Sequence, residues 1–297
     1  DSILQARFGF FATGKKGETQ DLVLENEDVK ITFSTNGGKV KEVLLKKHVS
    51  QTKQPIVLID EKSSQIEEEW ATAQYGNIDF NTLFYQGQVN GNTVTFSLGN
   101  ETQQLQRSYT LAENGYVLNY AVSTVGLESI LQNAPVKLHW KDRMKRVEKD
   151  LPTSRMRTTV NYYLADESFD NLSETSTSPE SEKLEQPAKW ISLKQKFFNT
   201  ALITDKTLNN ALVSLAPVAE SDTSSVKIAE LSVEIPQADL MGGAGNVRYY
   251  FGPNDLDICN EVAPGFGENV YLGWAILAPI SRYLIIPFFQ FLEGYIS

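Results

Sequence analysis

The sequence predicts an all-β protein, a large antiparallel sandwich. Short segments rich in Val, Ile, Leu, Thr and aromatic residues follow one another between residues 21 and 252, with apolar side chains at alternate positions. Asn-Gly turn signals separate several of these segments, and helical periodicity is almost missing before residue 253. Because strands do not alternate with helices, a sheet-on-sheet fold is favoured over a parallel α/β fold.

The first residues are predicted to lead into the sandwich as a short helix and a linker. Ile3, Leu4, Phe8 and Phe11 have the spacing of a helix that covers residues 2–11. The polar stretch 12–20 then indicates a linker. The chain begins without an initiator Met or a signal-like segment, so we expect it to be part of a longer protein.

The strands of the sandwich are read from period-two alternation and from the turns between them. The hairpin at Asn114-Gly115 has the clearest signal, with Tyr116, Leu118 and Tyr120 predicted to share one face. The predicted strands are 21–26, 29–35, 39–47, 55–60, 92–99, 105–111, 115–124, 157–165, 189–204, 210–217, 225–235 and 246–252.

Composition excludes several classes of function. The net charge is -10, with 27 basic and 37 acidic residues, which argues against a nucleic-acid partner. Cys259 is the one cysteine, and His48 and His139 are the only histidines, so neither an internal disulfide nor a metal site is expected. No dinucleotide-binding or phosphate-binding loop occurs, and no cofactor is expected.

No catalytic residue is predicted from the sequence. Neither histidine lies beside a nucleophile motif, and both are interpreted as surface or half-buried side chains. The acids at 67–69 and 166–167 offer paired carboxylates, but runs of acids are more often solvated faces. The acidic, Ser-rich and Thr-rich run 166–187 is expected to be a long solvated excursion from the sandwich.

One segment of this acidic chain is locally basic. Residues 136–157 contain eight Lys and Arg residues and three acids. This charge favours contact with anionic lipid headgroups or with an acidic partner surface. A solvated strand pair or loop is the alternative interpretation. The candidate contact patch consists of Lys141, Arg143, Lys145, Arg146 and Lys149.

The chain ends in its most apolar segment, residues 271–297. A transmembrane helix is disfavoured because Arg282 would lie in the middle of the span and Pro279 and Pro287 would break its backbone ladder. An interfacial helix lying along a membrane fits better. A helix packed on the sandwich's own core is the alternative. The predicted membrane-interface residues are Trp274, Ile280, Arg282, Tyr283, Leu284, Phe288 and Leu292.

Five segments, spread in order along the chain, resemble the large periplasmic domain of the bacterial YidC/Oxa/Alb membrane protein insertase family, in its Bacteroidetes-like form. They are "LENEDVKITFSTNGGKVKEVLLKK" at 24–47, "PIVLID" at 55–60, "KWISLKQKFFNTALI" at 189–203, "YYFGPNDLDI" at 249–258 and "LGWAILAPISRYLIIPFFQFL" at 272–292.

This resemblance implies a β-supersandwich of galactose-mutarotase-like architecture that faces the periplasm at the bacterial inner membrane. It implies three parts: an N-terminal helix and linker at 1–20 after a first transmembrane segment, the sandwich at 21–252, and C-terminal helices at 253–297. In that family the segment corresponding to 271–297 is an amphipathic helix along the outer face of the membrane. The groove that accepts nascent membrane segments lies in a later transmembrane bundle, so no groove residue is assigned here.

The resemblance further implies a noncatalytic docking or scaffold module of an insertase. Its expected partners are Sec translocon components, the membrane lipid surface and, through the transmembrane bundle, nascent inner-membrane proteins. A periplasmic carbohydrate-binding or mutarotase-like sandwich is the competing hypothesis, and it needs a histidine and a carboxylate that converge in a cleft. A structural spacer without any partner is a third possibility.

Overall fold

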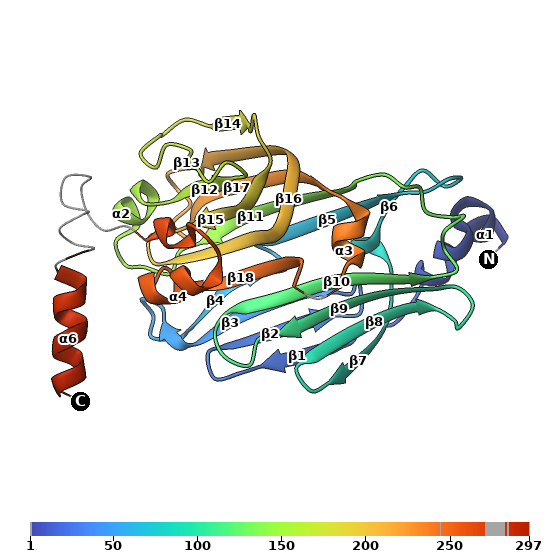
Figure 1. Ribbon diagram of the computed structural model, residues 1–297, viewed down its shortest axis with the longest axis horizontal. Coiled ribbons are helices and arrows are strands. Elements are labelled where there is room, and N and C mark those ends of the chain that lie inside the picture. Colours follow the sequence, from blue (N-terminus) through green and yellow to red (C-terminus); the bar gives the residue numbers. More distant parts are fainter. Residues whose placement is uncertain (1, 244, 271–282, 284, 297) are drawn as a thin grey trace.

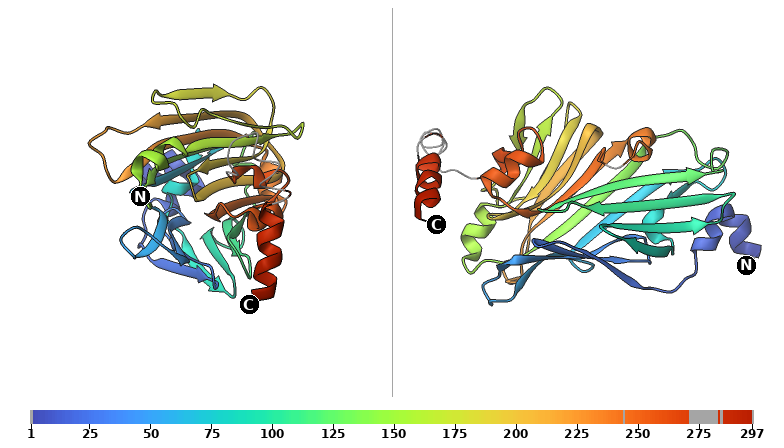
Figure 2. Two further views of the ribbon diagram at one scale, coloured as in Figure 1. Left: turned by 90° about the vertical axis from the view of Figure 1, so that its left-hand side faces the viewer. Right: turned by 60° about the horizontal axis from the view of Figure 1, so that its bottom comes forward.

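The computed structural model describes residues 2–243, 245–270, 283 and 285–296. Two antiparallel sheets face each other across one apolar core (Figure 1). The smaller sheet is a meander in the order β1-β2-β3-β4, and Figure 2 shows it below the larger sheet in the right-hand view. Its strands are β1 (Asp21–Glu25), β2 (Val29–Ser34), β3 (Lys39–Val49) and β4 (Pro55–Asp60).

The larger sheet has the order β6-β5-β11-β17-β16-β18-β10-β9-β8-β7, and β12, β13, β14 and β15 are attached beside that path. All of its strand pairs are antiparallel. The predicted all-β sandwich is therefore confirmed. Its strands are β5 (Ser64–Ala71), β6 (Asn77–Asp79), β7 (Gln86–Asn90), β8 (Thr93–Gly99), β9 (Gln104–Leu111), β10 (Val117–Val125), β11 (Val136–Lys145), β12 (Thr159–Leu164), β13 (Phe169–Asn171), β14 (Glu180–Lys183), β15 (Ala188–Lys194), β16 (Phe198–Pro217), β17 (Ser225–Ile235) and β18 (Val247–Pro253).

The helices are short and lie around the sheets. A helix lies within each of the predicted terminal segments, α1 within 2–11 and α6 within 271–297, and the two are at opposite sides of the molecule in Figure 1. The helical elements are α1 (Ser2–Phe8), η1 (Gly9–Gly14), η2 (Phe80–Thr82), α2 (Leu151–Met156), α3 (Gln237–Met241), α4 (Leu256–Val262), η3 (Phe266–Asn269) and α6 (Ile286–Ile296).

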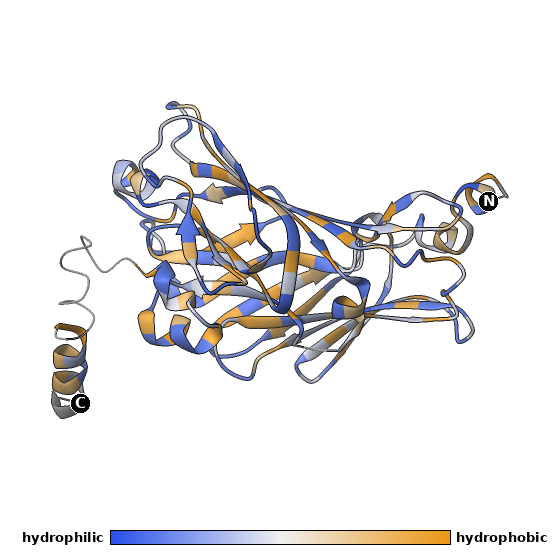
Figure 3. Ribbon diagram, turned by 45° about the horizontal axis from the view of Figure 1, so that its top comes forward, coloured by the Kyte–Doolittle hydropathy of each residue, from blue (hydrophilic) through white to orange (hydrophobic). Residues whose placement is uncertain are grey.

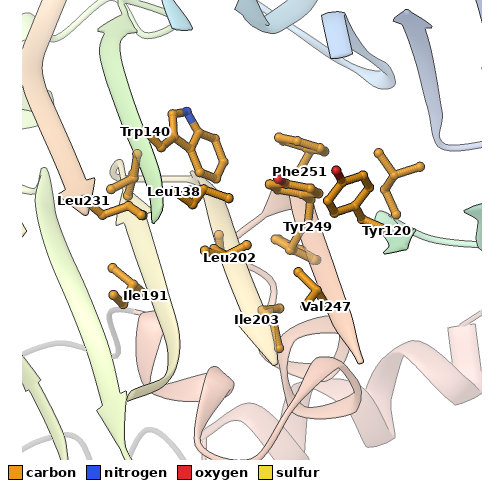
Figure 4. Packing of buried hydrophobic residues seen from close by; sticks show 14 of the residues in the cluster. Tyr120, Leu138, Trp140, Ile191, Leu202, Ile203, Leu231, Val247, Tyr249 and Phe251 are labelled. Atoms are coloured by element: carbon orange, nitrogen blue, oxygen red, sulfur yellow. The ribbon is translucent and has the colours of Figure 1, made fainter. Parts of the chain in front are cut away.

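An aromatic cluster lies at the centre of the core. Trp140 of β11 packs edge-on against Tyr249 of β18 with ring centroids 5.7 Å apart, and Tyr249 stacks on Phe251 at 5.9 Å. Tyr120 of β10 approaches Tyr249 from the other side, as Figure 4 shows. Period-two alternation carries these rings inward, and Figure 3 shows the resulting alternation of hydropathy along the strands.

The predicted hairpin at Asn114-Gly115 is confirmed. Strands β9 and β10 pair across it, and Gly115 has the positive φ that the turn needs. Tyr116, Leu118 and Tyr120 are all buried, as their shared face predicts. Cys259, the one cysteine, is fully buried in α4.

The strand predicted at 189–204 is wrong. The chain turns back at residues 195–197, so that β15 and β16 form a hairpin. β16 then continues for 20 residues through the predicted break before 210–217. Its register shifts between Asn209 and Leu212, and Asn210 has φ +47, a value that Asn tolerates better than most residues.

Three other local predictions need correction. Residues 12–14 belong to η1, so the linker is shorter than the polar stretch suggests. The run 166–187 is mostly exposed, as predicted, but it contains β13 and β14, which pair with β12 and β16. The acids at 67–69 are part of β5, and Glu68 points into the core instead of toward water. Strand pairing, which sequence alternation does not reveal, decides the second and third of these cases.

Candidate functional site

The C-terminal helix α6 exposes a group of aromatic side chains. Phe288, Phe289 and Phe291 are 58%, 58% and 61% exposed, and Tyr283, which precedes the helix, is exposed as well. Leu292 is half-buried. Several exposed phenylalanines on one helix indicate a surface that binds a membrane or another protein. Figure 3 shows α6 as a largely apolar ribbon beyond the sandwich.

The described part of α6 is joined to the sandwich by a polar contact. Gln290 donates a hydrogen bond from Nε2 to Asp257 Oδ2 of α4 at 2.6 Å. No described α6 residue belongs to the apolar core or packs against it, so the alternative of a helix packed on the sandwich's own core gains no support from this part of the chain. The predicted interface residues Trp274, Ile280, Arg282 and Leu284 lie outside the described residues.

No helix within the described ranges is long and apolar enough to cross a bilayer.

The basic patch is divided between a strand and a loop. Lys141, Arg143 and Lys145 lie on β11, a central strand of the larger sheet. Each forms an ion pair: Lys141 with Glu230 at 2.9 Å, Arg143 with Asp222 at 2.6 Å and Lys145 with Asp60 at 2.7 Å. These three charges are therefore largely neutralised within the chain.

The other two patch residues, Arg146 and Lys149, lie in the loop between β11 and α2. Arg146 donates from Nε to the carbonyl of Glu148 at 2.9 Å, and from its other nitrogens to the carbonyls of Thr223 and Lys149. These bonds hold the guanidinium in place without cancelling its charge. Lys149 is exposed. The patch thus keeps its uncompensated charge at the loop.

A buried polar network that sequence reasoning missed surrounds Arg107 of β9. Its Nη2 lies 3.1 Å from Glu68 Oε2 of β5, and its Nε donates to the Tyr120 hydroxyl at 2.9 Å. Nη1 donates to Asn81 Oδ1 and to the carbonyl of Gly37, where φ is +97. The inward phase of Arg107 among apolar neighbours in "LQRSYTL" was the available signal.

The polar groups of this network are buried and bond to one another. Glu68 accepts hydrogen bonds from the Trp70 indole at 2.8 Å and from the Tyr120 hydroxyl at 2.8 Å, in addition to Arg107. Burial raises the pKa of Tyr120 well above its ordinary value, so the hydroxyl remains a donor. Both charged groups are almost completely buried, and their bonding capacity is used by the protein itself. The network joins β5, β9, β10 and the β2–β3 turn.

The two histidines lie in separate environments. His48, at the end of β3, packs edge-on against Phe198 at 5.3 Å, and burial lowers its pKa. His139 of β11 has Nδ1 2.7 Å from Ser232 Oγ and Nε2 3.4 Å from Glu230 Oε2. His139 also lines a shallow hollow of about 330 Å³. His139 and the Glu230 carboxylate are therefore close in space, although they are far apart in the sequence.

Among the described residues there is no group of His, Cys, Asp and Glu side chains that could hold a metal ion.

Comparison with known proteins identifies similar sequences and folds. The model of the YidC periplasmic domain family matches residues 21–286. The chain is 36% identical to a membrane protein insertase YidC of Amoebophilus asiaticus, covering 100% of this chain and 51% of that protein. It is 33% identical to the YidC of Cytophaga hutchinsonii, covering 99% and 49%. The chain thus spans about half the length of these curated relatives.

Two solved structures align more distantly. A putative aldose 1-epimerase from Escherichia coli K12 has a TM-score of 0.46 and 9% identity, covering 80% of this chain and 99% of that chain. The periplasmic domain of the Thermotoga maritima YidC has a TM-score of 0.35 and 9% identity, covering 84% and 91%.

Proposed function

The chain belongs to the YidC periplasmic domain family, and from this premise we propose that it is the noncatalytic, periplasm-facing module of an insertase at the bacterial inner membrane. The module assists the insertion and folding of inner-membrane proteins as a docking or scaffold element. Residues 21–252 form its body, residues 1–20 lead in from a first transmembrane segment, and residues 253–297 return the chain to the membrane.

One observation carries the proposal: the sandwich is followed by a helix with exposed Phe288, Phe289 and Phe291. A helix lying in the headgroup region would bury these rings and hold the sandwich near the bilayer. The closed network at Arg107 supports the noncatalytic part, since its charged groups are used to join strands. In this function the sandwich provides the docking surface, and α6 holds the sandwich at the membrane.

Vesicle flotation tests the membrane location. The intact 297-residue chain is mixed with phosphatidylcholine vesicles, and the chain carrying Phe288→Ser and Phe291→Ser is compared with it. We expect the variant to lose most of its bound fraction, since each ring contributes roughly 1.5–3 kcal/mol when fully buried. A variant with Val23→Ser and Val89→Ser, two exposed valines of the sandwich, is the matched control. Equal flotation of all three chains would contradict the proposed location.

Docking to the Sec translocon is tested separately. Photocrosslinking residues are placed on exposed positions of the sandwich within the full insertase, in vesicles that carry the translocon. A docking module gives crosslinks confined to one face, whereas a spacer gives none. The same vesicles without the translocon are the control.

Carbohydrate binding is a second candidate function, favoured by the approach of His139 to Glu230 beside the shallow hollow. Against it, the described lining residues include no Trp, Tyr or Phe on which a sugar ring could stack. Calorimetric titration with a panel of sugars decides the matter. Binding that disappears in His139→Ala would favour this function over a docking module.

A further inference from the structure

Positive charge is concentrated at one end of the sandwich. Segments 47–53, 146–157 and 194–198 together contain eight Lys and Arg residues and two acids, whereas the whole chain has 27 and 37. We call these three segments the basic end. Figure 1 shows this end, with α2 and α4, on the side of the sandwich nearest α6 and away from the N terminus. The basic end therefore reverses the charge sign of the rest of the protein.

Contacts between the segments make the basic end one surface. Gln51, in the β3–β4 turn, donates its backbone N–H to the carbonyl of Val147 at 3.0 Å. The ring of His48 packs against Phe198 at 5.3 Å, which joins the same turn to the start of β16. These contacts bring together residues that are about 100 to 150 positions apart in the sequence.

Some charges of the basic end are neutralised, and others are not. Glu174 pairs with both Arg157 and Lys194, and so also links the second and third segments. Lys47 pairs with Asp28 at 2.8 Å. Five cations of the basic end form no ion pair with any acid in the described part of the chain: Lys53, Arg146, Lys149, Arg155 and Lys196.

Four acids near the basic end have partners within the fold. Asp222 pairs with Arg143, Asp150 caps α2 and Asp255 caps α4. Asp257 accepts the hydrogen bond from Gln290 of α6. The exposed ammonium groups of Lys53 and Lys149 therefore remain available to an anionic partner, whereas Arg146 and Arg155 also donate to backbone carbonyls.

Each segment of the basic end also exposes one large apolar side chain. Val49 is 64% exposed, Met156 is 54% exposed and Phe197 is 47% exposed. The Lys196 ammonium lies 4.7 Å from the centre of the Phe197 ring. An apolar side chain beside a cation fits a membrane interface, where the apolar part enters the headgroup region and the charge meets lipid phosphates.

We propose that the basic end is a second membrane-contact surface, which binds anionic lipid headgroups while Val49, Met156 and Phe197 enter the headgroup region. This proposal rests on the proposed location at a membrane. The basic end lies next to α4, since Asn254, just before α4, donates its backbone N–H to the carbonyl of Phe197 at 2.7 Å, and α4 in turn contacts α6 through Asp257 and Gln290. Lipid fits this surface better than nucleic acid, since a phosphate backbone would leave the three apolar side chains in water. Two contacts fix the orientation of the sandwich on the bilayer, which α6 alone does not.

Vesicle binding of the intact chain tests the proposal. The variant Lys149→Glu, Lys196→Glu, Phe197→Ser is compared with the matched control Lys62→Glu, Lys183→Glu, Leu212→Ser, in which Leu212 is 44% exposed outside the basic end. Vesicles contain phosphatidylcholine with or without phosphatidylglycerol. On the anionic vesicles at low salt we expect the first variant to bind at least about tenfold more weakly than the natural chain, and the control to change by less than about twofold.

A fluorophore at position 197 gives an independent result. In Phe197→Cys the attached dye should shift its emission to the blue on anionic vesicles, whereas a dye at Leu212→Cys should not. Cys259 is buried and does not compete for the label. If the triple variant fails to fold, as judged by circular dichroism, this single substitution decides. An unshifted emission at position 197 would overturn the proposal.

The chain with Phe288→Ser and Phe291→Ser separates this proposal from the proposed function. Binding lost in the α6 variant but equal in the triple variant and its control would overturn the basic-end contact and leave the role of α6 standing. Binding lost in the triple variant alone would support the basic end and count against α6 as the membrane anchor.

Discussion

Glu68 and Asp142 are buried carboxylates on the neighbouring strands β5 and β11, and their surroundings differ. Glu68 accepts hydrogen bonds from Arg107, Trp70 and Tyr120. Asp142 is only 2% exposed, and its Oδ1 has no hydrogen-bond partner among the described residues. Burial raises the pKa of Asp142 to about 8, although the nearby Lys145 opposes this shift. Glu68 therefore links strands of the sandwich, whereas the burial of Asp142 destabilises it.

Burial alone therefore does not determine how much a charged side chain contributes to the stability of the fold. A buried carboxylate is tolerated when donors surround it, and is costly when they are missing. Both side chains have the inward phase of a regular strand, so the difference arises from what lies opposite them.

Removing the partner of Glu68 should have the largest effect. Arg107→Met leaves the carboxylate buried without its cation, and we expect the free energy of unfolding to fall by about 3–5 kcal/mol. Urea denaturation followed by tryptophan fluorescence measures the loss. The double variant Glu68→Met, Arg107→Met is the control, because it removes both charges together. If the double variant is no more stable than Arg107→Met, the network is not held by this ion pair.

Replacing Asp142 should act in the opposite direction. The pKa of this acid is raised from 3.8 in the unfolded chain to about 8 in the fold, so the folded chain retains a proton that the unfolded chain releases. Its effect on stability therefore grows more unfavourable as pH rises from about 4 to about 8, and levels off above that. We expect Asp142→Asn to stabilise the protein by about 2 kcal/mol or more at pH 8.

The pH dependence supplies the check on Asp142. Thermal unfolding of Asp142→Asn and of the natural chain should converge as the pH falls below about 4, where the acid becomes protonated in the unfolded state as well as in the folded state. Asp60 and Lys145 also face this site, and the pKa of Asp60 is lowered by its bond to Lys145. Because that pair is intact in both chains, its titration cancels in the difference. A stability difference that is constant with pH would contradict this account.

Breaking the half-exposed pair beside Asp142 should have a smaller effect. Lys145→Met removes the ion pair with Asp60, and we expect a loss below about 1 kcal/mol because solvent screens the pair. The same change should raise the pKa of Asp142 further, since Lys145 is the cation that lowers it. Carboxyl NMR titration measures the shift. A lower pKa of Asp142 in this variant would show that the Lys145 charge is not what lowers it in the natural chain.

An exposed pair should contribute least. Lys41 of β3 lies 2.7 Å from Asp21 of β1, and their side chains are 31% and 46% exposed. We expect Lys41→Met to change the free energy of unfolding by no more than about 0.5 kcal/mol, with a smaller effect at high salt. A loss as large as that of Arg107→Met would break the contrast between buried and exposed charges.

Much of the sandwich could be predicted because its signals are local. Alternation with period two and Asn-Gly turns identified the hairpin at Asn114-Gly115 and most of the other strands. The central strand β11 is not among the predicted strands. The strands β5 and β7 were also missed, since "SQIEEEWA" and "QGQVN" contain few of the residues typical of strands. Their place is fixed by pairing with β11 and β8.

The candidate surfaces could be predicted only in part. Composition indicated the apolar segment 271–297 and the basic segment 136–157. It did not reveal that Lys141, Arg143 and Lys145 would meet Glu230, Asp222 and Asp60, which are 89, 79 and 85 positions away. The basic end likewise includes the turn 194–198, and the sequence does not show that its charges lie next to those of the loop at 146–157.

By itself the sequence determined which side chains share a face of each strand, where the tight turns lie, and that the chain ends in a segment suited to an apolar phase. These properties depend on residues a few positions apart. Only the tertiary structure decided which charges are neutralised, that Glu68 has partners while Asp142 Oδ1 has none, and which loops gather at one end. Alternation fixes the side of a sheet on which a residue lies, whereas strand order and register fix its neighbours, because the energies involved act between segments distant in sequence.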